Sequence, residues 1–479
     1  MNIVEEIFKR TDPTAAALVE DGKTTTYSEL EKQVDACAAG FGRLANFEGR
    51  RIGMLWRDGA SHVVIALAIL RAGGCLVPLA GELSAVERAV VASTTALDYI
   101  VSEAGAKLGI PNLSLLHGDS CPENIAVWQC TEDRVPGFPE DRLRALDPAF
   151  VRFSSGTTGE KKGIVLSHST LMERVIAANE GLGIGPHDRV LWVLPMAHHF
   201  AVSIVLYLWS GATTLLQKSH LGTEMIDVAI REGATVVYGS PFHHRLLAAT
   251  ERSTGSWRTL RLAVSTASAL SEEVAFAFLA RFGRALTQGL GIIEVGLPFL
   301  NTRCAASKPL SIGRPLPAFR SELRNTKGTP ESDEGELFLS GPGMVDAYLA
   351  PWQTRPNILR DGWFGTGDIV RRDADGDHFL LGRTRSVINV GGLKCFPEEI
   401  EAVLNLHPGV ARARVIGKSH PQFGSMPVAE IIPVNRGEPP SQTSLLAHCR
   451  LRLARYKMPI EYRLVEQIEL TASGKIKRA

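Results

Sequence analysis

The chain has 479 residues, a length that allows about three domains or one large domain with a smaller partner. Hydrophobic residues make up 45% and charged residues 22%, which is typical of a soluble globular protein with a sizeable core. The 52 basic and 51 acidic side chains give a net charge of +1, so we expect no nucleic-acid partner and no electrostatic attraction to membranes. Seven scattered cysteines without zinc-like spacing indicate reduced thiols and a cytoplasmic location.

Short apolar runs alternate along the chain with helix-length stretches. In chain order we expect helices at residues 61–73 and 271–283, and strands at residues 51–56, 75–80, 189–195, 212–217, 234–240 and 260–268. Continuous apolar strands separated by helices are typical of mostly parallel sheets that are covered on both faces. The sequence therefore predicts an α/β fold.

Two segments bear on membrane association. The N-terminus MNIVEEIFKR is acidic and amphipathic and lacks the apolar stretch of a signal peptide. The most apolar window, residues 200–216, is broken by Ser, Gly and Thr, and this predicts a buried helix that runs into a strand. We expect no membrane span.

The character of the sequence changes between residues 370 and 390, where a turn-like DADGD and several arginines occur. Beyond it we expect helices at residues 396–406 and 444–456 and strands at residues 411–417 and 427–434. We place a boundary near Arg385 and Ser386. It divides the chain into a large domain, 1–385, and a small α+β domain, 386–479.

The stretch RFSSGTTGEKKG, residues 152–163, follows the strand-like PAFV. Such a loop can turn backbone N–H groups inward, while its hydroxyls and Lys162 supply further donors and positive charge. A polyphosphate needs these groups, although a solvated surface loop has a similar composition. It is not a Walker loop, because Gly163 follows the lysine where Ser or Thr is required. The candidate phosphate ligands in the loop are Ser154, Ser155, Gly156, Thr157, Thr158, Gly159 and Lys162.

Further segments follow this loop in the order QGLGIIE (288–294), GELFLSGPGMVDAYL (335–349), DGWFGTGDIVRRDADGDHFLLGRTR (361–385), GGLKCFPEEIE (391–401) and TASGKIKR (471–478). Together with SSGTTGEKKG and TTTYSEL (24–30), they resemble the signatures of adenylate-forming enzymes, the superfamily of acyl-CoA synthetases, luciferases and peptide-synthetase adenylation domains. The resemblance covers nearly the whole chain. It implies a large N-terminal domain of layered, mostly parallel sheets and a small mobile C-terminal α+β domain.

The resemblance also implies roles for single residues. Glu294 would hold Mg²⁺ on the ATP phosphates, because a hard cation prefers carboxylate oxygen. Asp368 would accept hydrogen bonds from the ribose hydroxyls, and Arg383 would be its companion donor to the nucleotide. The wall beside the adenine would be formed by Gly289, Leu290 and Gly291, whose glycines allow close backbone approach.

Lys475 is the expected catalytic cation. Attack of a carboxylate on the α-phosphate brings two anions together, and an ammonium group between them reduces the repulsion. The expected products are an acyl-adenylate and pyrophosphate, after which a thiol displaces AMP to give a thioester. The thiol would belong to coenzyme A or to the phosphopantetheine of an acyl or peptidyl carrier protein. In relatives the small domain rotates between these steps, here about Arg385 and Ser386.

The segment LPMAHHF (194–200) lines the acyl pocket in relatives. Relatives that activate amino acids place an aspartate there, and its absence here argues against an α-amino acid. His198 would gate or orient the substrate carboxylate, while a core histidine is the competing interpretation. We expect a fatty or other non-amino carboxylic acid, with an aryl acid as the alternative. The other pocket candidates are His199, Phe200, Ser203, Tyr238, Gly239, Ser240, Thr266, Ala267 and Val295.

Four positions depart from the family pattern. Lys161 stands in place of a common proline, and Ile293 replaces the hydroxyl residue that usually precedes the metal glutamate. Ser386 replaces a charged hinge residue, and Asn389 replaces a frequent lysine.

Two other classes of function remain open. A nucleotide-binding regulator without catalysis would not need Glu294, Asp368, Arg383 and Lys475 together. A phosphohydrolase of the P-loop type would need the missing GK[ST].

Overall fold

The computed structural model describes residues 1–479 except 117–123, 132–136, 154–161, 218, 220, 251–256, 326–332, 385, 391–392, 422, 471–475 and 477–479. Its described residues form two compact units. Unit 1 comprises residues of 1–320 and 340–364, and unit 2 comprises residues of 321–339 and 365–479. The domain boundary expected at 385/386 falls within unit 2 and stays a prediction, because Arg385 lies outside the described residues.

One sheet of unit 1 has a parallel centre with antiparallel strands toward both edges. Strand β3 pairs in parallel with β4 and β5, and β4 pairs in parallel with β8, whereas β7, β6, β9 and β19 pair antiparallel. In the described residues the order is β20 (Gln353–Thr354), β19 (Ala347–Tyr348), β9 (Gly163–Ser167), β8 (Pro148–Phe153), β4 (Cys75–Pro78), β3 (Arg51–Leu55), β5 (Tyr99–Glu103), β7 (Ile125–Cys130) and β6 (Leu113–Leu116).

A second run of strands in unit 1 is parallel from β1 to β14 and antiparallel at its ends. Its order is β16 (Ser311–Pro315), β15 (Gly296–Leu300), β14 (Leu286–Ile292), β13 (Leu262–Ser265), β12 (Val236–Gly239), β10 (Arg189–Trp192), β11 (Thr213–Leu216), β1 (Ala16–Glu20) and β2 (Lys23–Thr26).

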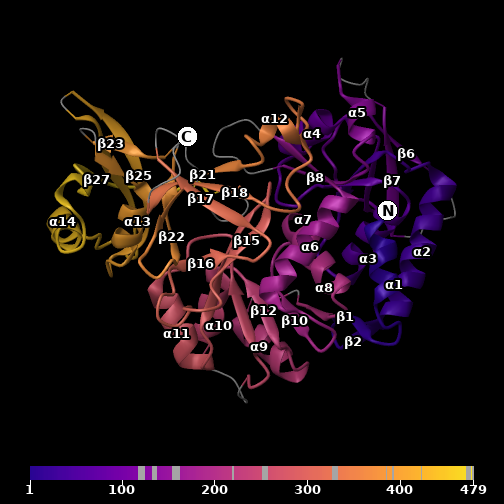
Figure 1. The fold of residues 1–479 in the computed structure, drawn as a ribbon, viewed down its shortest axis with the longest axis horizontal. Helices are drawn as coiled ribbons and strands as arrows, with labels where there is room; N and C mark the ends of the chain where they lie inside the picture. Colours follow the sequence, from indigo (N-terminus) through magenta and orange to yellow (C-terminus); the bar gives the residue numbers. More distant parts are fainter. Residues whose placement is uncertain are drawn as a thin grey trace. The chain divides into compact units, whose positions relative to one another are not determined.

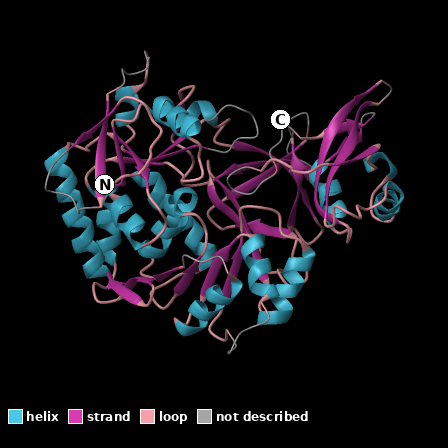
Figure 2. Cartoon of the chain, turned by 180° about the vertical axis from the view of Figure 1, so that it is seen from behind, coloured by secondary structure: helices cyan, strands magenta, loops and turns pink. Residues whose placement is uncertain are grey.

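The helices of unit 1 pack along these strands (Figure 2). Several begin at capping residues: at α2 the Thr26 hydroxyl accepts from the Glu29 amide while the Glu29 carboxylate accepts from the Thr26 amide. Helices α1, α2 and α3 lie side by side (Figure 1). The helices are α1 (Ile3–Arg10), α2 (Tyr27–Leu44), α3 (Ala60–Arg71), α4 (Ala85–Thr95), α5 (Glu140–Arg144), α6 (His168–Leu182), α7 (Met196–His199), the π-helix η1 (Phe200–Ile204), α8 (Val205–Trp209), α9 (Gly222–Arg231), α10 (Pro241–Ala249), α11 (Glu272–Phe282) and α12 (Arg355–Ile358).

The α/β architecture with mostly parallel central strands confirms the predicted fold class. Each strand expected between residues 51 and 268 is present, and the apolar window 200–216 is a buried helical segment followed by β11. Two apolar cores support the strands, one between β10–β14 and α9–α11 and the other around β4, β5 and β8. Among the described residues, no helix is both long and apolar enough to cross a bilayer.

In the described residues, unit 2 contains four neighbouring strands in the order β17, β18, β21 and β22, of which β21 and β22 pair antiparallel, and a separate five-stranded sheet. The core of the five-stranded sheet holds Ile400 and Leu404 of α13 and Leu445 of α14. The elements are β17 (Arg320–Arg324), β18 (Glu334–Ser340), β21 (Phe364–Arg372), β22 (His378–Arg383), β24 (Leu393–Cys395), β23 (Ile388–Val390), β26 (Gly424–Pro433), β25 (Val410–His420), β27 (Glu461–Leu464), α13 (Pro397–Asn405), α14 (Gln442–Arg450) and the 3₁₀ helix η2 (Arg455–Lys457).

The helix expected at residues 444–456 is shorter than predicted. Helix α14 ends at Arg450, and η2 follows after Ala454 adopts an extended conformation. Leu453 is buried in the apolar core of the five-stranded sheet, whereas Leu451 is 81% exposed. The apolar residues that predicted a longer helix thus lie in a turn, which buries Leu453 and leaves Leu451 in solvent.

Candidate active site

The predicted phosphate loop joins two adjacent strands of unit 1. Strand β8 ends at Phe153 and its antiparallel partner β9 begins at Gly163. The loop candidates Ser154, Ser155, Gly156, Thr157, Thr158 and Gly159, as well as Lys161, lie outside the described residues. Lys162 is described, and its Nζ lies 4.8 Å from the centre of the Tyr348 ring. This cation–π contact holds positive charge at the end of the loop.

Glu294 lies in the turn between β14 and β15. Its backbone carbonyl accepts a hydrogen bond of 2.8 Å from the Val345 amide, and its Oε1 accepts one of 3.2 Å from the Tyr348 hydroxyl. Burial, followed by the negative charge of Glu294, raises the pKa of Tyr348, so the phenol stays a donor at neutral pH. The turn and the carboxylate are therefore both held by residues 345–348.

Two arginines interact electrostatically with Glu294. Burial lowers the pKa of Arg152 and of Arg174 to about 10, and the charge of Glu294 acts against this shift in both. Both guanidinium groups are therefore protonated at neutral pH. Arg152 beside Glu294 and Lys162 beside the Tyr348 ring provide positive charge that suits an anionic ligand such as a polyphosphate, whereas Arg174 is buried.

The residues around Glu294 fit a magnesium ion that is bound to the protein through a single carboxylate. The metal-type carboxylate triplet of the described residues lies elsewhere, in unit 2, where Asp373, Asp375 and Asp377 share one turn. Glu294 would therefore contribute a single carboxylate. One such ligand is enough for Mg²⁺ when phosphate oxygens and water supply the others.

The candidate adenine wall is the last part of β14. Gly289 is tightly packed, since an added Cβ would lie 3.2 Å from Leu297 Cδ1. Gly291 has space on its side-chain face, where the nearest atom to an added Cβ is Thr266 Oγ1 at 3.8 Å. Leu290 pairs with Phe299 of β15, and the register shifts just beyond it. The strand thus presents little side-chain bulk at Gly291.

Most of the candidate pocket residues are buried. Tyr238 packs its ring against Tyr207, Tyr207 against Trp192, and Trp192 against His199, with centroid distances of 6.5, 6.0 and 6.1 Å. Burial raises the pKa of Tyr238 to about 12, so its hydroxyl is neutral. Ala267 has a left-handed φ of 71°. The buried candidates are Phe200, Ser203, Tyr238, Gly239, Thr266 and Val295, and Ser240 is partly exposed at the start of α10.

His198 has a partner that the sequence did not indicate. Its Nε2 lies 2.6 Å from Glu82 Oε1, and the side chains are 20% and 43% exposed. The hydrogen bond from His198 lowers the pKa of Glu82. His198 is therefore tied to the segment between β4 and α4, which orients its ring.

Unit 2 brings the two predicted ribose residues together. Asp368 and Arg383 are opposite each other in the antiparallel pair β21–β22, and Arg383 Nε lies 2.9 Å from Asp368 Oδ1. Near them, the Ser386 hydroxyl donates to Glu398 Oε1 at 3.0 Å. Lys475 lies outside the described residues.

Four site residues escaped sequence reasoning: Glu82, Arg152, Arg174 and Tyr348. Tyr348 lies within the signature GELFLSGPGMVDAYL, and Arg152 is the first residue of the stretch RFSSGTTGEKKG. Both could therefore have been proposed as site residues from the sequence. Arg174 and Glu82 had no such signal, because only the tertiary fold brings them to Glu294 and His198.

Comparison with known families gives the same assignment as these residues. The AMP-binding enzyme model matches residues 5–349, and the AMP-binding enzyme C-terminal domain model matches residues 399–475. The chain belongs to the AMP-binding enzyme family. It is therefore an ATP-dependent, AMP-forming acid–thiol ligase.

Similar curated members of this family act on different acids. A feruloyl-CoA synthase of Amycolatopsis sp is 28% identical, with 98% of this chain and 95% of that protein covered. A sulfoacetate–CoA ligase of Cupriavidus necator is 32% identical over 74% of this chain and 70% of that protein. A fatty acid–[acyl-carrier-protein] ligase, ScoC of Streptomyces coeruleorubidus, is 28% identical over 98% of this chain and 93% of that protein.

Solved structures support the fold. The o-succinylbenzoate CoA synthetase of Bacillus subtilis, in complex with its acyl-adenylate intermediate, has a TM-score of 0.84 with this chain. It is 22% identical, and the match covers 100% of this chain and 97% of that chain. The adenylate-forming enzyme fold predicted from the sequence is confirmed.

Proposed function

We propose that the protein activates a non-amino carboxylic acid with Mg²⁺-ATP and transfers the acyl group to coenzyme A. The substrate carboxylate attacks the α-phosphorus, the bond to the bridging oxygen breaks, and pyrophosphate leaves. The thiolate then attacks the acyl carbon and AMP leaves with the bonding electrons.

The observation that carries this proposal is the charge arrangement around Glu294. One carboxylate, supported by Tyr348, has the cations Arg152 and Arg174 in its electrostatic environment, and the predicted phosphate loop begins directly after Arg152 and Phe153. When bound there, Mg²⁺ would neutralise phosphate charge. We assign the metal role to Glu294, and Arg152 and Lys162 hold the anionic leaving group by charge.

The other roles follow from the family motifs. Ser154, Ser155, Gly156, Thr157, Thr158, Gly159 and Lys162 would bind phosphate, and Gly289, Leu290 and Gly291 would line the adenine. Asp368 and Arg383 would bind the ribose, which their 2.9 Å ion pair supports by fixing the orientation of the carboxylate. Lys475 would bridge the reacting anions, and His198 would orient the acid.

The substrate we propose is a fatty or other non-amino acid, with an aryl acid as the second candidate. The ring cluster of Trp192, His199, Tyr207 and Tyr238 supports keeping the aryl acid as the second candidate, because flat aromatic ligands pack well against ring edges and faces. The relatives include a feruloyl-CoA synthase and a fatty-acid ligase, so they support each candidate.

The acceptor and the cellular location are further proposals. Coenzyme A and a carrier-protein phosphopantetheine share one reactive end, and ScoC supports the carrier alternative. The seven cysteines are scattered through the sequence without paired or zinc-like spacing, which favours a reducing cytoplasm.

The testing experiment is acid-dependent exchange of pyrophosphate into ATP, with a panel of aryl and fatty acids, followed by acyl transfer to coenzyme A or to a loaded carrier protein. We expect exchange with at least one acid class and a thioester with coenzyme A. Lys475→Ala should abolish exchange while sparing transfer from a preformed adenylate. Acid-independent ATP hydrolysis, or nucleotide binding without turnover, would contradict the proposal.

A further inference from the structure

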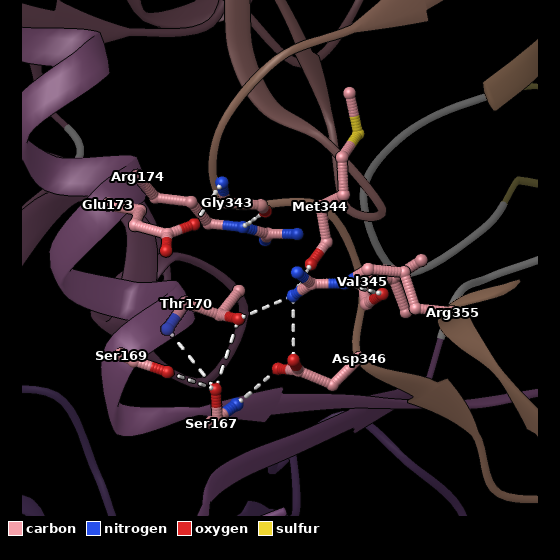
Figure 3. A network of polar contacts seen from close by, with 10 residues as sticks. All are labelled: Ser167, Ser169, Thr170, Glu173, Arg174, Gly343, Met344, Val345, Asp346 and Arg355. Carbon is pink, nitrogen blue, oxygen red and sulfur yellow. Dashed lines mark hydrogen bonds and ion pairs between the residues drawn. The ribbon is translucent and has the colours of Figure 1, made fainter. Parts of the chain in front are cut away.

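A buried arginine joins the turn that carries Glu294 to a distant segment of unit 1. Arg174, on α6, donates from Nε to the Gly343 carbonyl at 2.6 Å and from Nη1 to the Ile293 carbonyl at 2.8 Å. Figure 3 shows its guanidinium extending from α6 to Gly343. Because Ile293 directly precedes Glu294, this one side chain bridges the turn and residues 343–345.

Other hydrogen bonds hold the same two segments together. The Val345 amide donates to the Glu294 carbonyl at 2.8 Å, and the Gly343 amide donates to Glu173 Oε2 at 2.7 Å (Figure 3). Residues 343–345 are thus held by α6 on one side and hold the Glu294 turn on the other.

The local sequence is adapted to the path of Arg174. Gly343 has a φ of 67°, and a Cβ added there would lie 2.5 Å from Arg174 Cγ. Gly296, just after Glu294, has a φ of 110°, and its added Cβ would lie 3.4 Å from the same atom. Arg174 itself is only 4% exposed. Two glycines with left-handed backbone therefore flank the aliphatic part of this arginine.

We propose that Arg174 is a positioning residue that fixes the Ile293–Glu294 turn so that the Glu294 carboxylate can serve the metal–nucleotide complex. Ile293 has no side-chain hydroxyl, and Arg174 holds the turn from α6 by binding the Ile293 backbone carbonyl. The inference rests on the proposed role of Glu294.

Three variants separate this role from a general structural one. Arg174→Lys keeps the charge, but a single ammonium group cannot reproduce the planar fork that binds both carbonyls. Glu173→Ala removes an exposed acceptor of Gly343 and weakens the same clamp without entering the core. Arg355→Lys is the matched control.

Arg355 also holds the neighbouring segment, but not the turn. Its Nη2 donates to the Met344 carbonyl at 2.7 Å and to Asp346 Oδ1 at 2.7 Å, and its Nε donates to the Val345 carbonyl at 3.2 Å (Figure 3). None of its hydrogen bonds within the described part of the chain reaches residues 293–294.

The measurement is calorimetric binding of ATP with and without Mg²⁺, together with the Mg²⁺ dependence of pyrophosphate exchange. We expect Arg174→Lys to raise the half-saturating Mg²⁺ concentration about 10-fold, the size of effect typical for residues that orient metal ligands. ATP binding without Mg²⁺ should stay within about 2-fold of wild type, as should every Mg²⁺ parameter of Arg355→Lys.

A Mg²⁺ dependence of Arg174→Lys like that of wild type, or an equal shift in Arg355→Lys, would overturn the inference. If Arg174→Lys does not fold, Glu173→Ala decides: a shift of about 3-fold in the same direction supports the positioning role, and no shift refutes it. If no acid supports exchange in the wild type, the proposed function fails, yet the Mg²⁺-dependent binding of ATP still tests Arg174.

Discussion

The surroundings of Glu294 in unit 1 and the Asp368–Arg383 pair of unit 2 are built in opposite ways. Glu294 interacts with Tyr348, Arg152 and Arg174, which come from three distant parts of the chain. Asp368 and Arg383 are opposite each other on two strands of one hairpin, and the Arg383 side chain is 49% exposed.

Because the two regions differ in this way, a substitution should affect stability and binding together near Glu294 but binding alone at the Asp368–Arg383 pair. Removing one member of a buried charge cluster leaves the others without compensation, so loss of function and loss of stability are coupled there. A half-exposed arginine can instead regain water, so the hairpin pair can be altered with a small change in stability. Four predictions test this contrast, beginning with the largest expected loss of activity and ending with the smallest effect.

Glu294→Gln should cause the largest loss. We expect pyrophosphate exchange to fall on the order of 100-fold, as when one electrostatic contact to a transition state is removed. The free energy of unfolding should also fall, because the buried cations Arg152 and Arg174 lose a favourable charge interaction. Urea unfolding and exchange assays measure the two effects. An inactive variant with unchanged stability would show that the charge cluster does not support the fold.

Asp368→Asn should lower nucleotide affinity by about 10-fold, the value of one or two charge-assisted hydrogen bonds. Its free energy of unfolding should change by no more than about 1 kcal/mol, because the partner Arg383 is half-exposed. Nucleotide titration and thermal unfolding provide the comparison, with Arg383→Lys as the milder control. A loss of stability as large as that of Glu294→Gln would remove the contrast between the regions.

Two glycine substitutions compare the regions at equal backbone strain. Gly343 and Gly367 both have φ near 70°, but an added Cβ meets Arg174 Cγ at 2.5 Å in the first and no atom within 4 Å in the second. Gly367→Ala should cost about 1 kcal/mol from backbone strain alone. Gly343→Ala should cost about 2 kcal/mol more through overpacking. Equal losses in chemical denaturation would mean that the Arg174 side chain moves aside freely.

Glu82→Gln should have the smallest effect. The hydrogen bond from His198 lowers the pKa of Glu82 below its ordinary value of 4.5. The pair therefore contributes stability above that value, and the contribution disappears as the pH falls through the lower folded pKa. The melting temperatures of wild type and Glu82→Gln should differ at pH 7 and converge once the pH falls below the lowered pKa of Glu82 in the folded protein. A difference that persists in acid would assign another role to Glu82.

The hairpin pair was predictable because its cause is local. The turn DADGD joins β21 to β22, and the antiparallel pairing, with one register shift between Ile369 and Val370, places Asp368 opposite Arg383. The parallel strands were predictable for a similar reason, since continuous apolar runs between helices allow few other folds.

The partners of Glu294 were not predictable in the same way. Arg174 lies on α6 and looks in the sequence like any helix-surface arginine, but the packing of α6 buries it against Gly343 and Gly296. Glu82 is separated from His198 by more than a hundred residues, and no local pattern links them. Contacts between residues that are distant in the sequence depend on tertiary packing, so no periodic pattern in the sequence predicts them.

Ser386 limits how readily the backbone can pivot at the predicted hinge. Its amide donates to the Arg383 carbonyl at 3.0 Å and its hydroxyl to Glu398 Oε1 at 3.0 Å. A rotation at this residue has to break both bonds, which at about 1 kcal/mol each slows it roughly 30-fold relative to an unrestrained joint. If rotation at this hinge limits turnover, breaking these hydrogen bonds would set its rate. Ser386→Gly would then raise the turnover rate and stabilise each of the two domain orientations less.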